Sequence, residues 1–146
     1  MFRAMSEADR MKSMRFHSPN CEIVIERPAA RVVVVRVSGW DVGEFGEAPI
    51  TEVETDLATP GKLRLFIDAR DVKGASMEVS NAWARWLAAH RERFHSVHMA
   101  TGSRFIRMTA DFVRRYAELD GIMTVDENTG AFEAALRTAI EATGRA

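Results

Sequence analysis

One stretch, Leu63 to Phe94, constrains the fold of this chain more than any other. It begins with a short apolar run and continues through the polar segment Asp68-Ala69-Arg70-Asp71. Apolar and aromatic residues then recur at spacings of one, three and four, at Val79, Trp83, Trp86, Leu87, His90 and Phe94. Such spacing gathers side chains on one face of a helix, whereas the apolar run suits a buried strand. The stretch is predicted to form a strand, a loop and a helix.

Two strands are predicted before this unit. Cys21, Ile23 and Ile25 alternate with their neighbours until Pro28, which is typical of a half-buried edge strand that ends in a turn. Residues 32–35 form an unbroken run of valines, which favours a central strand covered on both faces. The short segment between the two runs predicts a β-hairpin.

The rest of the chain alternates helix and strand signals. Pro49 favours the first turn of a short helix, Val97 to Ala100 reads as a strand, and Ser103 is a good helix cap. The helix after Ser103 is expected to carry its apolar residues on or beside one stripe, at Phe105, Ile106, Thr109, Phe112, Val113, Tyr116 and Leu119. A strand at 122–125 and a final helix follow. The order predicts an α/β fold with a mixed, mostly parallel sheet of about five strands, an N-terminal hairpin and about four helices.

Composition limits the class of protein. With 146 residues, 47% of them hydrophobic, the chain is expected to form one domain over residues 19–146, after a flexible extension at 1–18. Twenty basic and twenty-one acidic residues nearly cancel, which disfavours nucleic acid as a partner. The absence of a long apolar segment predicts no membrane insertion. The single cysteine, Cys21, cannot form an internal disulfide, which fits a cytoplasmic protein.

The segment from Leu63 to Val72 is an apolar strand that reaches an aspartate, a short polar turn and a valine. This segment and the order of elements from Cys21 to Ile140 resemble the STAS domain of bacterial anti-sigma-factor antagonists, the SpoIIAA-like family. The resemblance implies a signalling module that works by protein–protein interaction, with neither catalysis nor a cofactor. It also implies a protein partner, such as a kinase-like anti-sigma factor or another regulator, and leaves a homodimer open.

The family carries an Asp-Ser pair at the start of the helix after this strand, and its serine is phosphorylated. Here the region reads Lys73-Gly74-Ala75-Ser76-Met77-Glu78-Val79-Ser80, without an Asp-Ser pair. Ser76 is nearest in position to the family's serine and Ser80 is next, so both are candidate phosphorylation sites. A hydroxyl at this position also has a purely structural explanation, because serine commonly caps a helix.

A candidate partner surface follows from the same region. Trp40 and Phe45 flank a glycine-spaced loop and would mark a contact surface if they are exposed. Asp71, Lys73 and Met77 belong to the loop and helix start through which the resemblance predicts partner contact.

A different class of function competes with partner binding. Thr101, Gly102 and Ser103 precede a helix that carries Arg104 and Arg107, an arrangement that could bind an anion or a small ligand. An ordinary helix cap explains the same residues.

Metal binding has less support in the sequence. Asp68 and Asp71 could bind Mg²⁺, but solvation of a loop explains them more simply. His95 and His98 would point to opposite faces of a strand, so no metal site is predicted.

Overall fold

The computed structural model describes residues 13–144 and contains one six-stranded sheet in the order β1-β2-β3-β4-β5-β6. β2 is antiparallel to both β1 and β3, whereas β3 to β6 are parallel. This confirms the predicted hairpin and the mixed, mostly parallel sheet. The strands are β1 Ser13–His17, β2 Cys21–Ala29, β3 Val32–Asp41, β4 Leu63–Ala75, β5 Phe94–Thr101 and β6 Met123–Asp126.

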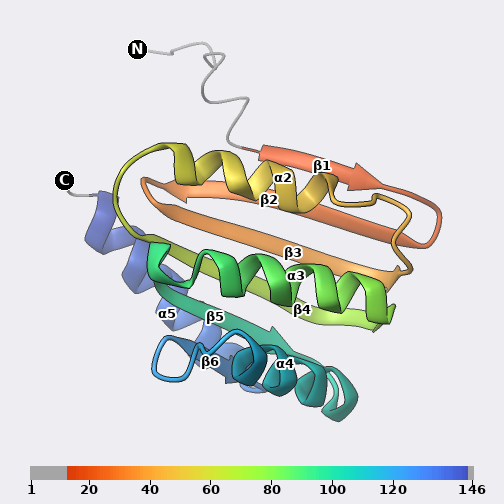
Figure 1. Cartoon of the computed structure of the whole chain (residues 1–146). Helices are drawn as coiled ribbons and strands as arrows, with labels where there is room; N and C mark the ends of the chain where they lie inside the picture. Colours follow the sequence, from red (N-terminus) through yellow and green to blue (C-terminus); the bar gives the residue numbers. More distant parts are fainter. Residues whose placement is uncertain (1–12, 145–146) are drawn as a thin grey trace, which may run out of the picture.

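Within the described residues, four helices cover both faces of the sheet. α2 (Ala48–Glu54), α3 (Met77–Ala89) and α4 (Arg104–Tyr116) lie on one face, and α5 (Thr129–Gly144) lies behind the other (Figure 1). Two short 3-10 turns, η1 (Thr55–Ala58) and η2 (Arg91–Arg93), follow α2 and α3. No helix within residues 13–144 is long and apolar enough to span a bilayer.

β3 is buried on both faces, as its valine run predicts. Val33 and Val35 belong to the larger core, beneath α2, α3 and α4. Val32 and Val34 belong to the smaller core, beneath α5. Because successive side chains of a strand point to opposite faces, four consecutive valines supply both cores at once.

The sixth strand comes from residues that the sequence assigned to a flexible extension. β1 pairs with β2, so β2 is an inner strand and not the predicted edge. Phe16 holds β1 to the domain, because its ring lies 5.8 Å from that of Phe45 and packs against the larger core. β2 also continues past Pro28, after a register shift between Glu26 and Ala29 that accommodates the proline. Residues 1–12 of the predicted extension lie outside the described residues.

β4 is longer than the predicted strand and includes Asp68–Asp71, which the sequence assigned to a loop. Asp68 is buried, and its carboxylate accepts hydrogen bonds from Arg36 at 2.8 Å and from Arg70 at 2.7 Å. Burial alone would raise the pKa of Asp68, but these hydrogen bonds outweigh it and hold the pKa below its usual value. With the charge paired, the strand continues to Ala75 beside the end of β3.

The packing of α5 on the sheet depends on Phe132. Its side chain is fully buried, and its ring meets that of Phe66 edge to face at 5.8 Å. We expect Phe132→Ala to lower the free energy of unfolding by about 3–5 kcal/mol, because it leaves a cavity under the helix. Urea denaturation measures this.

The exposed Arg137 on the same helix provides the control. Arg137→Ala should change stability by no more than about 0.5 kcal/mol. A loss for Phe132→Ala no larger than that of the control would contradict the packing described for α5.

Candidate functional site

The carboxyl ends of β3, β4 and β5 meet the amino-terminal ends of α3 and α4 at one edge of the sheet, the edge formed by the ends of the strands. This edge lies on the right in Figure 1. In open parallel sheets, binding sites commonly form beyond the carboxyl ends of the strands. Most of the candidate residues predicted from the sequence lie at this edge.

Ser76 caps α3. Its Oγ accepts a hydrogen bond from the backbone N–H of Val79 at 3.2 Å, and its own N–H donates to the carbonyl of Asp41 at 2.9 Å. The cap therefore ties the start of α3 to the end of β3. Ser80 follows one turn later and is half-buried. The structural role predicted for a hydroxyl at Ser76 is thus present, and phosphorylation of Ser76 or Ser80 stays a prediction.

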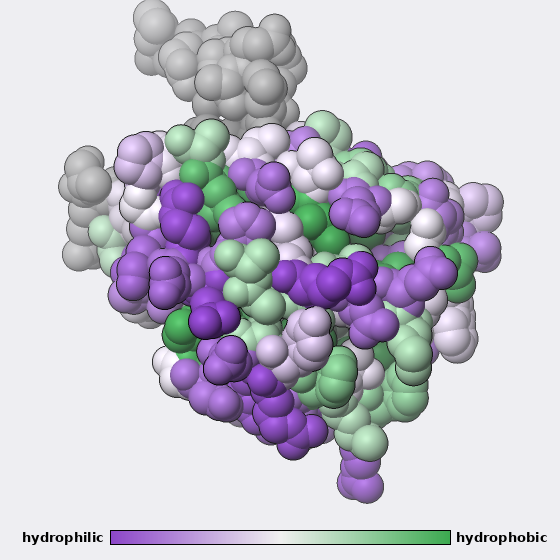
Figure 2. Space-filling model, in the orientation of Figure 1, coloured by the Kyte–Doolittle hydropathy of each residue, from purple (hydrophilic) through white to green (hydrophobic). Residues whose placement is uncertain are grey.

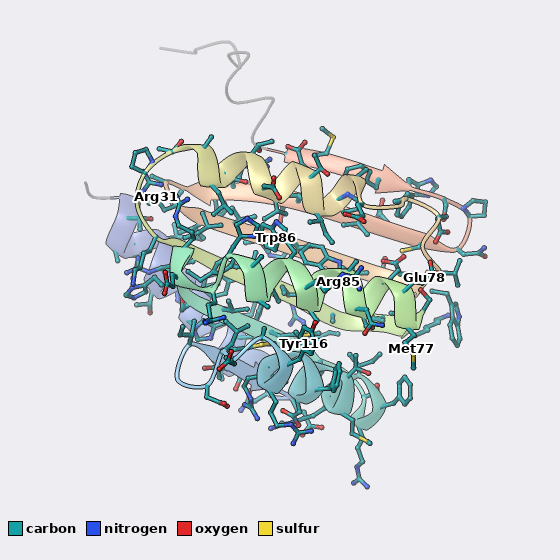
Figure 3. The ribbon with its side chains drawn as sticks, in the orientation of Figure 1. Arg31, Met77, Glu78, Arg85, Trp86 and Tyr116 are labelled. Atoms are coloured by element: carbon teal, nitrogen blue, oxygen red, sulfur yellow. The ribbon has the colours of Figure 1, made fainter. Side chains whose placement is uncertain are left out.

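Trp40 precedes Asp41 at the end of β3 and is 53% exposed. It pairs with Gly74 across β3 and β4, and a Cβ at Gly74 would come within 2.4 Å of the indole ring. The ring therefore lies directly against the backbone of β4, where a side chain in place of Gly74 would displace it. Met77 is 79% exposed and is labelled at the start of α3 in Figure 3.

The other predicted partner residues differ in their exposure to solvent. Asp71 and Lys73 lie on the last part of β4 and are exposed. Phe45 is half-buried, because its ring packs on Phe16 and against the larger core. Phe45 therefore supports β1 and is not part of an exposed surface with Trp40.

α4 differs from its predicted packing. Its buried residues are Ile106, Ala110 and Val113, followed by Ala117 just after the helix. A second apolar stripe points to solvent and comprises Phe105, Met108, Phe112 and Tyr116. Sequence reasoning assigned three of these to one stripe with the core residues. The inner face of the helix is thus formed by Ile106, Val113 and small alanines, whereas the large aromatic side chains lie on the outer face.

The exposed apolar residues at this edge form what we call the carboxyl-end surface: Trp40, Val42, Met77 and Phe105. Val42 is 61% exposed and Phe105 is 65% exposed. Figure 2 shows hydrophobic side chains gathered over the starts of α3 and α4. Sequence reasoning found Trp40 and Met77 but missed Val42 and Phe105, whose apolar character fits a core equally well.

In the predicted anion site at Thr101 to Arg107, the side chains of Ser103 and Arg107 already have partners within the chain. Ser103 Oγ accepts from the N–H of Ile106 at 3.1 Å, and Arg107 pairs with Glu127 at 3.1 Å and Asp111 at 3.8 Å. Gly102 is backed by the carbonyl of Arg70, because a Cβ there would lie 2.2 Å from that oxygen. Thr101 is buried, whereas Arg104 is exposed. An anion would have to compete with two carboxylates, so this site stays a prediction.

Cys21, Asp41 and Glu44 bring three side chains of metal-binding type within 4.8 Å of one another. Burial, followed by the two neighbouring carboxylates, raises the pKa of the Cys21 thiol to about 11. Since a thiol binds metal as the thiolate, this proton disfavours a metal ion. Glu44 also accepts a hydrogen bond from Ser18 Oγ at 2.6 Å, which links the hairpin to the loop after β3.

Comparisons with solved structures identify the architecture. An uncharacterized protein of the DUF3478 family from Shewanella loihica, described as having a SpoIIAA-like fold, aligns with a TM-score of 0.57 and 15% identity. The alignment covers 84% of this chain and 98% of that one. The fold is SpoIIAA-like.

A second solved structure agrees with this assignment. An anti-sigma factor antagonist from Mycobacterium paratuberculosis aligns with a TM-score of 0.50 and 19% identity, over 84% of this chain and 99% of that one. No protein-family model and no curated protein matches the sequence. At these identities the matches establish the fold alone. This fold is the one that the sequence resemblance predicted.

The cap at Ser76 has a measurable energy. We expect Ser76→Ala to lower the free energy of unfolding by about 1 kcal/mol, since the N–H of Val79 loses its acceptor. Ser76→Asp should retain most of the stability, because aspartate also caps helices and its charge suits a helix N-terminus. Urea denaturation of both variants tests this.

Ser80→Ala is the matched control, because Ser80 lies within the same helix and does not cap it. A loss for Ser76→Ala equal to that for Ser80→Ala would show that Ser76 does not cap α3.

Proposed function

We propose that the protein is a non-enzymatic regulatory module that binds another protein with its carboxyl-end surface. The observation that carries this proposal is the exposed indole of Trp40, seated on Gly74 at the end of two central strands. Exposed tryptophans on rigid elements are common hot spots of protein interfaces. The fold adds support, since one of the two structural neighbours is described as an anti-sigma factor antagonist.

The surface combines rigidity with apolar contact area. Trp40 lies on β3, and Met77 begins a helix whose cap is bonded to the same strand. Because the backbone at both positions is already fixed by secondary structure, partner binding does not have to order it. Asp71 and Lys73 on β4 add charges at the rim of this surface, where charge affects the choice and orientation of a partner.

Ser76 is the proposed regulatory site within this surface, with Ser80 as the second choice. Ser76 is half-buried between Asp41 and exposed Met77, whereas Ser80 lines the space between α3 and α4. A phosphate on Ser76 would add about two negative charges at a helix N-terminus, where they are tolerated. The same charges would change the apolar surface around Trp40 and Met77 that a partner contacts.

Partner binding is tested by crosslinking in cells. A photoreactive amino acid in place of Met77 should capture one specific protein, whereas the same group in place of Arg137 on α5 should not. The captured protein is then purified, and its affinity for this chain is measured by calorimetry. We expect the double variant Trp40→Ala/Met77→Ala to weaken binding by at least about tenfold. Equal affinities for this variant and the unchanged protein would contradict the proposal.

Gly74→Ala is an independent variant for the same measurement. It changes none of the four residues of the carboxyl-end surface but displaces the ring of Trp40, because the new Cβ would lie within 2.4 Å of it. Weaker binding by this variant, with a native circular dichroism spectrum, would show that the position of the ring matters. Capture of a second copy of the chain at Met77 would instead identify a homodimer interface. That result would contradict the proposal that this surface binds a different protein.

Regulation is tested by mass spectrometry of the protein isolated from its own cells under several growth conditions. We expect a phosphate on Ser76 that is absent from Ser76→Ala, and weaker partner binding by the phosphorylated form because of the added charge. Unmodified Ser76 and Ser80 under every condition would contradict the regulatory role but leave partner binding intact.

A further inference from the structure

A cavity of about 120 Å³ lies between α3, α4 and the sheet. Its lining includes Val35, Ile67 and Met99 on the strands, Leu87 on α3, and Ala110 and Val113 on α4. Among its lining residues only Asp41, Ser80 and Thr109 are polar. The space is therefore almost entirely apolar.

The sequence leaves this space by placing small residues where the two helices face the sheet. Ala69, Ala75 and Ala110 line the cavity at positions where larger side chains would fill it. Protein interiors usually contain few voids larger than a water molecule. An apolar space of this size offers a water too few polar partners, whereas an apolar molecule would restore the missing contacts.

The cavity opens at the same edge of the sheet as the starts of α3 and α4. Half-buried Ser80, Trp83 and Thr109, with exposed Phe105, lie along its lining, so it is reached from solvent between the two helices. Figure 3 shows α3 and α4 side by side, with Met77 at the start of α3.

The buried carboxyl group of Asp41 disfavours an anionic ligand in the cavity. It is only 6% exposed, and its Oδ1 accepts a hydrogen bond from the N–H of Gly43 at 3.1 Å. Burial raises the pKa of Asp41, and the nearby carboxylate of Glu44 raises it further against the effect of that hydrogen bond. No lysine or arginine lines the cavity to balance an anionic ligand.

We propose that this cavity binds a small neutral apolar molecule, about the size of a six-carbon ring, with at most one hydroxyl group directed toward Asp41. The size follows from the comparison with an engineered apolar cavity of roughly 150 Å³ that stays dry and binds benzene. Neutrality follows from the apolar lining and the buried carboxyl group. This inference rests on the cavity alone and does not depend on the carboxyl-end surface.

Benzyl alcohol and benzoate are the matched probes, because they have the same ring and differ in charge. The methyl groups of the methionines, labelled with carbon-13 and assigned by Met→Leu variants, report the position of the ring by NMR. Met99 and Met123 line the cavity, whereas Met77 and Met108 are exposed and do not line it. The chain therefore contains its own controls.

We expect benzyl alcohol to shift the methyl signals of Met99 and Met123 in a saturable manner. The signals of the exposed Met77 and Met108 should stay in place. Benzoate should bind at least about tenfold more weakly than benzyl alcohol. Ala110→Leu, which fills the cavity, should weaken the binding of benzyl alcohol, whereas Ala131→Leu at an exposed position of α5 should not. The unchanged protein with its two probes supplies a result even if Ala110→Leu fails to fold.

Three outcomes would overturn the inference. They are unchanged signals of Met99 and Met123 at saturating probe concentrations, shifts confined to Met77 and Met108, and equal binding of benzoate and benzyl alcohol.

Discussion

The burial of β3 on both faces is the constraint on which the rest of the structure depends. Val32 and Val34 are covered by α5, whereas Val33 and Val35 are covered from the side of α2, α3 and α4. A strand without a polar face requires helices on both sides of the sheet, and parallel neighbours reached by helical crossovers provide them. The antiparallel strands β1 and β2 complete the sheet on the other side of β3, where the chain returns through a hairpin.

This arrangement also explains the position of the candidate site. Because β3, β4 and β5 are parallel, their carboxyl ends meet at one edge, where α3 and α4 begin. β4 continues through Asp68 to this edge, with the charge of Asp68 paired by Arg36 and Arg70. The extended strand then carries Gly74, the residue against which Trp40 lies. The same strand, β4, thus carries the paired Asp68 in the middle of the sheet and, at its end, the glycine against which the exposed ring of Trp40 lies.

Sequence patterns predicted most of the elements because the corresponding signals are local. The valine run of β3 and the serine caps at Ser76 and Ser103 depend only on their neighbours along the chain. β1 was missed because its sequence, SMRFH, offers one large core residue, Phe16, and gains stability from a partner ring at Phe45. The continuation of β4 through Asp68 was missed for the same reason, since Arg36 lies on another strand. The exposure of Phe105 and the presence of the cavity could not be predicted. Both depend on how α4 packs on the sheet through Ala110, which is a contact between distant parts of the chain.

Oxidative footprinting of the chain in its own cells and after purification tests the central claim most directly, because it measures the exposure of individual side chains. In the purified protein, exposed Trp40 and Met77 should be oxidised rapidly and buried Met123 slowly. If the carboxyl-end surface binds a partner, Trp40 and Met77 should be protected in cells, while exposed Met108, outside the defined surface, serves as the reference for oxidant dose. Equal oxidation of Trp40 and Met77 in both settings, relative to Met108, would contradict the account.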